Sequence, residues 1–187
     1  MQHRAPASPV ATNEDTMRIV TMAVIGAGLM FAGWYFGEAK DQSFLGRAKR
    51  DEVVLVTKDD PAMEAARTKA RATLAAFLAT ARQPTAAMKN FALKVRVSDN
   101  HGVEYFWVTQ FSANGGRFSG KIDNTPRMVR SVAAGQVIQF GEGEITDWMY
   151  MDSGKMKGNY TACALLQREP KDQQDAVKNR FGLNCDA

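Results

Sequence analysis

Histidine and cysteine are scarce in this chain, which limits the metal and redox chemistry that it can support. Its 187 residues include two histidines, His3 and His101, and two cysteines, Cys163 and Cys185. Two cysteines are too few for a disulfide framework or for a structural zinc site. The scarcity of histidine excludes a histidine-rich metal site, so we expect no metal ion and no other cofactor.

The chain also lacks the charge pattern and the glycine-rich loop of nucleic-acid and nucleotide binders. The formal net charge is +4. However, Lys and Arg are spread among acidic residues and form no basic stripe with interleaved aromatic side chains. Its glycine pairs, such as Gly141 with Gly143, lie where hairpin turns are expected rather than between a strand and a helix. We therefore expect no nucleic-acid partner.

An uncharged apolar run over residues 19–37 is present near the N-terminus. A helix of this length would be about 28 Å long, close to the roughly 30 Å hydrocarbon core of a bilayer. The run exceeds the apolar region of a cleaved signal peptide, and no A-x-A cleavage site follows it. The sequence thus predicts a single transmembrane anchor helix over 18–37 that contacts the lipid bilayer through 19–37, after a disordered tail over 1–17 and before a charged linker over 38–52.

Residues 53–187 carry the strand, helix and turn signals of one α+β domain. Asp60 and Pro61 suit the N-cap and first position of a helix that ends near Arg82, before Pro84. Strand patterns follow, and a last short helix is expected over 170–181. We predict a largely antiparallel sheet packed by one long N-terminal helix and a short C-terminal helix, preceded by the single transmembrane helix.

Alternation along two of these strands predicts which side chains face the core. In the strand over 91–98, Leu93 and Val95 point inward and Lys94 points to the other face. In the strand that begins at Val103, we expect one shared face for Tyr105, Trp107, Thr109 and Phe111.

The stretch 147–166 is the part of the chain around which we expect the sheet to be organised. Trp148 and Tyr150 alternate with methionines in a first arm, a glycine-rich turn follows, and residues 160–166 return as an apolar arm. Because both faces are largely apolar, we predict a central β-hairpin covered on both sides. Core packing is the first interpretation of the two aromatic residues, and an aromatic recognition surface is the second.

Four blocks of sequence resemble one bacterial family. They are DDPAMEAARTKARATLAAFL, FALKVRVSDNHGVEYFWV, FSGKIDNTP and DWMYMDSGKMKGNYT. In this order they resemble the YegJ-like family of uncharacterised proteins (domain of unknown function 2314), over about residues 53–167. The anchor and the segment from Pro170 lie outside the resemblance. The resemblance implies a compact α+β domain, often behind an N-terminal signal or anchor, and it supplies no catalytic residue, substrate or cofactor.

The basic residues and the resemblance disagree about the side of the membrane. Lys40, Arg47, Lys49 and Arg50 follow the apolar run, and the positive-inside rule applied to them would keep the domain in the cytoplasm. The family resemblance favours the opposite side. We expect a single-pass protein of the bacterial inner membrane, with the C-terminal domain in the periplasm.

A polar set near two tryptophans is the best candidate for a binding site. Lys155 could bind an anionic group, and the aromatic side chains could form the walls of a pocket. The same polar residues could instead stabilise turns. The candidate binding residues are Trp107, Asn124, Asp147, Trp148, Lys155, Asn159 and Thr161.

These features leave several functions open. No nucleophile stands beside a histidine in the expected fold, so we expect no catalytic residue and favour a membrane-anchored, non-enzymatic binding domain of the envelope. It would dock a protein partner, as an inhibitor or immunity-type protein does. One alternative is a small envelope hydrolase that uses Glu104 or Asp147 as a general acid or base. Another is an accessory structural subunit of a membrane complex.

Cys163 and Cys185 leave two alternatives open. If the last helix folds back on the sheet, the tail reaches the final strand. A disulfide would then close a loop of about 20 residues and stabilise the fold by on the order of 3 kcal/mol. Such bonds persist in oxidising compartments. Otherwise Cys163 is a buried free thiol and Cys185 lies in a frayed tail.

Overall fold

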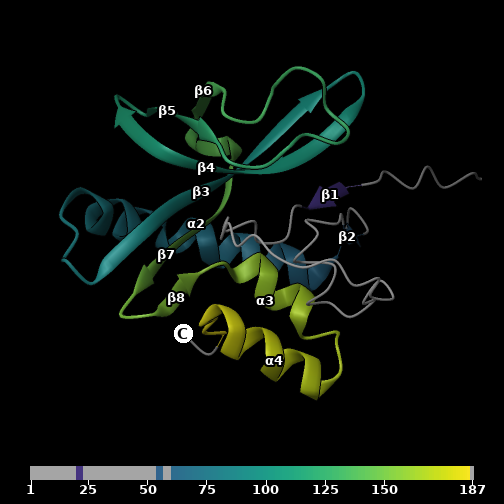
Figure 1. The fold of residues 1–187 in the computed structure, drawn as a ribbon. Helices are drawn as coiled ribbons and strands as arrows, with labels where there is room; N and C mark the ends of the chain where they lie inside the picture. The colour runs from purple at the N-terminus through teal and green to yellow at the C-terminus, as the bar shows by residue number, and fades with distance from the viewer. Residues whose placement is uncertain (1–19, 23–53, 57–59, 186–187) are drawn as a thin grey trace, which may run out of the picture.

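The computed structural model describes residues 20–22, 54–56 and 60–185, which form an α+β fold (Figure 1). The predicted tail over 1–17, the linker over 38–52 and most of the predicted anchor lie outside the described residues. A largely antiparallel sheet is packed by the long helix near the start of the domain and by two shorter helices near its end. The predicted α+β class with a largely antiparallel sheet is confirmed for this part of the chain.

The elements follow one another in a simple order. They are β1 (Val20–Met22), β2 (Val54–Val56), α2 (Pro61–Arg82), β3 (Met88–Asp99), β4 (Gly102–Asn114), β5 (Arg117–Ile122), β6 (Val137–Gly141), the 3-10 helix η1 (Glu142–Glu144), β7 (Ile145–Asp152), β8 (Lys155–Gly158), α3 (Tyr160–Leu166) and α4 (Lys171–Phe181). In the sheet, β2, β1, β4, β3, β7 and β8 lie side by side, and β5 joins β4 to β6. Among the described strands, β1 and β4 pair in parallel and the other pairs are antiparallel.

The predicted transmembrane helix over 18–37 is not supported by the structure. Val20–Met22 form β1, which pairs with β4 at residues 103–105 and with Val54–Val56 of β2. The rest of the predicted helix lies outside the described residues. Within the described part of the chain, no helix is both long and apolar enough to cross a membrane.

Helix α2 forms where the sequence predicts it, because its start is marked by local chemistry. The side chain of Asp60 accepts hydrogen bonds from the backbone N–H groups of Ala62 and Met63, and Pro61 occupies the first turn. The buried side chains recur at helical spacing and are Met63, Ala66, Ala70, Leu74 and Phe77. The first two pack in one hydrophobic cluster with α3 and α4, and the last three pack in a second cluster with the sheet.

A β-bulge in β4 overturns one prediction about its faces. Gln110 has a φ of +49°, and the pairing of β4 with β5 shifts register between Thr109 and Ser112. The extra residue turns Phe111 toward the second cluster, where its ring lies 5.8 Å from that of Phe77. Trp107 stays in the first cluster. The shared face predicted for Tyr105, Trp107, Thr109 and Phe111 is therefore wrong at Phe111.

The prediction of a returning strand over 160–166 is also wrong. Strand β8 ends at Gly158, and Tyr160–Leu166 form α3 beneath the sheet (Figure 1). Gly158 and Asn159 adopt left-handed φ values of +77° and +55°, which end the strand. The Asn159 carbonyl then accepts from the N–H groups of Ala162 and Cys163. Cys163 consequently lies on a helix and not on a final strand.

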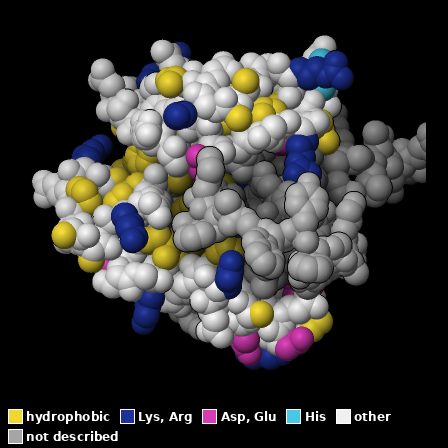
Figure 2. Space-filling view, viewed as in Figure 1, with side chains coloured by type: hydrophobic (Ala, Val, Ile, Leu, Met, Phe, Trp, Pro, Cys, Tyr) yellow, Lys and Arg dark blue, Asp and Glu magenta, His cyan; other side chains and the backbone are white. Residues whose placement is uncertain are grey.

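Basic side chains are scattered over the visible surface. On the face drawn in Figure 2, Lys and Arg side chains lie singly among other residues and do not merge into one basic patch.

Candidate functional site

Lys94, Asp147 and Thr161 form a buried polar cluster between the sheet and α3. Lys94 of β3 and Asp147 of β7 are cross-strand partners. The hydroxyl of Thr161 donates to Asp147 Oδ2 at 2.7 Å and accepts from Lys94 Nζ at 3.0 Å. All three side chains are almost completely buried. Lys94 was predicted to face away from the core, but α3 covers that face and encloses it.

The Asp147 carboxyl group is held by donors from two elements. Besides the Thr161 hydroxyl, the backbone N–H groups of Trp148, Tyr160 and Thr161 donate to it at 2.9, 3.3 and 2.8 Å. Burial raises the pKa of Asp147, while the nearby Lys94 charge and the hydrogen bonds from Thr161 and Trp148 oppose that rise. Four donated hydrogen bonds match the acceptor capacity of an ionised carboxylate. The arrangement fixes the start of α3 against β7.

Trp107 and Asn124 extend this cluster toward the loop after β5. Lys94 Nζ lies 5.0 Å from the centre of the Trp107 ring, within cation–π range. The backbone N–H of Trp107 donates to Asn124 Oδ1 at 2.7 Å. Among the described residues, Trp107 Nε1 and Asn124 Nδ2 are buried without a hydrogen-bond partner.

Trp148 and Asn159 are buried next to Asp147 and are held by both hydrogen bonds and packing. The Trp148 indole N–H donates to the Ala70 carbonyl at 3.1 Å, and its ring stacks on Phe77 at 4.9 Å. The backbone N–H of Asn159 donates to the Trp148 carbonyl at 2.8 Å. Lys155 is the exposed first residue of β8 and pairs with Asp152 of β7. Of the predicted binding residues, the structure joins Trp107, Asp147 and Thr161 through Lys94, places Asn124 beside Trp107, and leaves Lys155 apart.

Glu104 is fully engaged in positioning a loop. Glu104 is 2% exposed, and its carboxylate accepts hydrogen bonds from the backbone N–H groups of Arg127, Met128 and Val129 at 3.0 to 3.2 Å. These bonds fix the segment after Pro126 against β4. Neither Glu104 nor Asp147 lines the cavity found between α3 and α4.

The end of the described chain is fastened to the core by a disulfide. Cys163 of α3 and Cys185 are bonded, with their Cα atoms 5.5 Å apart. Just before Cys185, the Gly182 carbonyl accepts from the N–H of Met156 at 2.7 Å, and Leu183 forms a parallel bridge with Met156. The tail therefore lies beside β8.

Sequence reasoning missed Lys94, which is central to the polar cluster. A partial signal was present, because Lys94 stands between the apolar residues Leu93 and Val95 and shares its face with Ala92. It also missed the ion pair between Asp60 and Arg168, which ties the N-cap of α2 to the residues that follow α3.

The fold and these contacts define a small α+β domain closed by a disulfide, and comparison with known proteins assigns its family. A family model described as an uncharacterised protein conserved in bacteria (DUF2314) matches residues 60–185, and the chain belongs to this family. An uncharacterised protein of Escherichia coli (strain K12), YegJ, is 35% identical over 91 residues. The resemblance predicted from the four sequence blocks is thus confirmed.

The two matches cover different lengths of the chain. The match to YegJ covers 49% of this chain and 60% of the relative, so less than two thirds of that protein is spanned. The family model includes α4 and both cysteines, although we expected the segment from Pro170 to lie outside the resemblance. No solved structure matches the chain.

Proposed function

We propose that this chain is a non-enzymatic binding domain of the bacterial envelope that docks a protein partner. Its buried carboxylates are committed to internal structure: Asp147 accepts four hydrogen bonds, and Glu104 holds a loop through three backbone N–H groups. Side chains held in this way are not presented to a substrate, which favours binding over catalysis.

The docking surface that we propose is the edge of the sheet formed by β6. In the described part of the chain, β6 pairs with β5 and with no other strand. Its sequence, VIQFG, contains neither a charged residue nor a proline, which are the usual protections of an edge strand. Val137 is 64% exposed and is the one large hydrophobic side chain so exposed among the described residues. An extended segment of the partner would add to this edge through main-chain hydrogen bonds and cover Val137.

A charged substitution on this edge tests the proposal. We expect wild-type protein to co-purify with a stoichiometric partner in mild detergent, and Val137→Lys to lose it. Ala75→Lys adds the same charge at an exposed position of α2 and should retain the partner. Both variants should keep the thermal stability of the wild type, because both positions are exposed. Repeated recovery of the wild type alone contradicts docking, and equal recovery from both variants contradicts the role of β6.

We also propose that residues 19–37 tether the domain to the inner membrane, with the domain in the periplasm. The uncharged run supports a tether, and the disulfide is of a kind that persists in oxidising compartments. Full insertion of the run would remove Val20–Met22 from β4, so β1 and the anchor exclude each other for these residues. Retention of the full chain in carbonate-washed membranes supports the tether, whereas release into the soluble fraction contradicts it.

A further inference from the structure

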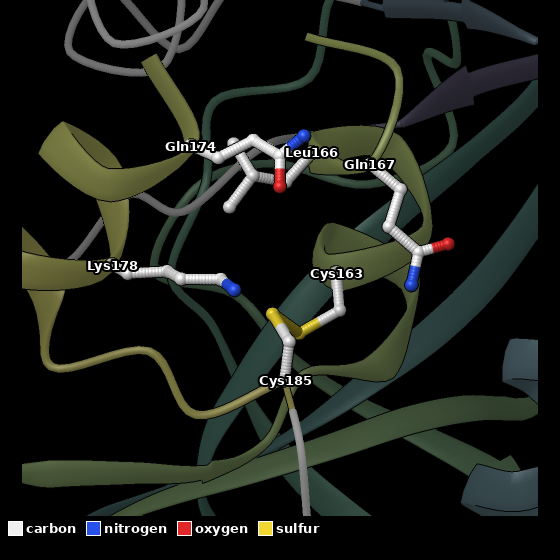
Figure 3. Close-up of a pocket in the computed structure, with 6 residues that line it drawn as sticks. All are labelled: Cys163, Leu166, Gln167, Gln174, Lys178 and Cys185. Atoms are coloured by element: carbon white, nitrogen blue, oxygen red, sulfur yellow. A yellow bond between two sulfur atoms is a disulfide. The ribbon is translucent and has the colours of Figure 1, made fainter. Parts of the chain in front are cut away.

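The Cys163–Cys185 disulfide lines an open cavity and is not sealed within the core (Figure 3). The cavity lies between α3 and α4 and has a volume of about 220 Å³. A water molecule occupies about 30 Å³ of liquid, so the space admits a small organic molecule. Its lining consists of Cys163, Leu166, Gln167, Gln174, Lys178 and Cys185.

Among the polar side chains that line the cavity, Lys178 points at the disulfide. Its amine comes from α4, and Gln167, at the end of α3, lines the other side of the cavity (Figure 3). Gln174 is steadied by a hydrogen bond from its Nε2 to the Glu169 carbonyl at 2.9 Å. A lysine ammonium beside sulfur attracts an anion and stabilises a thiolate.

We propose that this cavity is a site at which a small thiol bearing a carboxylate or sulfonate exchanges with the disulfide. The incoming thiolate attacks Sγ of Cys185, because Cys185 is half-buried whereas Cys163 is buried. A new S–S bond forms between the ligand and Cys185, and the Cys163–Cys185 bond breaks. The bonding electron pair remains on Sγ of Cys163 as a thiolate in the cavity that Lys178 also lines, so no further oxidant or reductant is consumed. This site is separate from β6 and does not depend on the proposed docking.

Three thiols that differ in charge test the site on the purified full-length protein. The probes are 2-mercaptoethanesulfonate, 2-mercaptoethanol and cysteamine, which are anionic, neutral and cationic. The rate of disulfide opening is followed by alkylation and mass spectrometry. Each rate is divided by the rate of the same thiol with an unstructured disulfide peptide, which removes differences in intrinsic nucleophilicity.

We expect the normalised rate of the anionic thiol to exceed that of the neutral thiol several-fold, and the adduct to lie on Cys185. Lys178→Gln should bring the ratio of the anionic to the neutral normalised rate close to one. Lys171→Gln removes a charge from an exposed position of the same helix and should leave the ratio unchanged. A wild-type ratio near one, an unchanged ratio in Lys178→Gln, or an adduct confined to Cys163 would overturn the proposal.

Discussion

Lys94 and Asp147 are partners across β3 and β7, and the hydroxyl of Thr161 joins their charged groups. Thr161 belongs to α3, so this bridge couples the helix to the centre of the sheet. A buried charge that loses its partner is costly, by about 3–5 kcal/mol. The position of α3 and the burial of the two charges therefore depend on each other.

Removal of the Thr161 hydroxyl should destabilise the domain. Thr161→Val keeps the shape of the side chain but deprives Lys94 Nζ of an acceptor and Asp147 Oδ2 of a donor. We expect the free energy of unfolding in urea to fall by about 1–3 kcal/mol. Thr161→Ser retains the hydroxyl and should lose less. Equal stability of the two variants would show that the bridge contributes nothing.

Gly158 and Gly154 form a matched pair for testing the turn into α3. Both have positive φ, of +77° and +79°. A Cβ on Gly158 would lie 2.2 Å from the Trp148 carbonyl oxygen, whereas a Cβ on Gly154 would meet open space. Each Ala substitution should cost about 1–2 kcal/mol for the backbone conformation. Gly158→Ala should lose roughly 1–3 kcal/mol more from the clash, measured by urea denaturation. Equal losses would contradict this packing.

The acid stability of the domain should depend on Asp99. Hydrogen bonds from the backbone N–H groups of Arg130, His101 and Ser131 hold the pKa of Asp99 at about 2, below its usual 3.8. Because the pKa is lower in the folded state, the stabilisation is present above pH 3.8 and is lost as the pH falls toward about 2. Asp99→Asn should flatten this decline in thermal unfolding measured from pH 2 to pH 5 (about the range that spans both values).

The control for Asp99→Asn removes a carboxylate that does not accept these backbone hydrogen bonds. Asp123 is exposed, so Asp123→Asn should reproduce the wild-type decline. If Asp99→Asn and the wild type lose stability in parallel over this range, the backbone hydrogen bonds to Asp99 do not govern acid stability.

The parts of the fold that could be predicted from the sequence are those specified by neighbouring residues. Asp60 and Pro61 mark the start of α2, and the helix follows from them. Gly115 and Gly116 supply two consecutive positive φ values between the paired residues Asn114 and Arg117, so the hairpin follows from a local pair. Such signals do not depend on what packs above the sheet.

The parts of the fold that the sequence pattern predicts wrongly are those that depend on tertiary packing. Residues 161–166 are all buried, and a short run that is apolar on every side has the same pattern in a strand and in a helix. The left-handed conformation of Asn159 ends the strand, so the residues after it form a helix, and no pattern in the sequence specifies that conformation. With a strand at 160–166, the predicted fold has no element that covers Lys94. The polar cluster was therefore only partly predictable.

The state of the two cysteines can be measured directly. Protein from cells quenched with an alkylating agent, then denatured without reduction, should show no free thiol and should run as a monomer on a non-reducing gel. The bond spans a sequence separation of 22 residues. Replacing both cysteines by Ser should cost about 3 kcal/mol of stability. Two alkylated thiols in the unreduced protein would contradict the bond and remove a principal support for a periplasmic domain.

Docking at the β6 edge is the central claim, and crosslinking from Val137 in intact cells tests it most directly. A photoreactive phenylalanine analogue is placed at position 137, or at position 75 on α2 as the control, since both positions are exposed. We predict that the protein that co-purifies in mild detergent crosslinks from position 137 and not from position 75. Gln139→Lys, which adds a charge at an exposed position of the same edge, should abolish the crosslink. No crosslink from position 137, or equal crosslinks from both positions, would contradict the account.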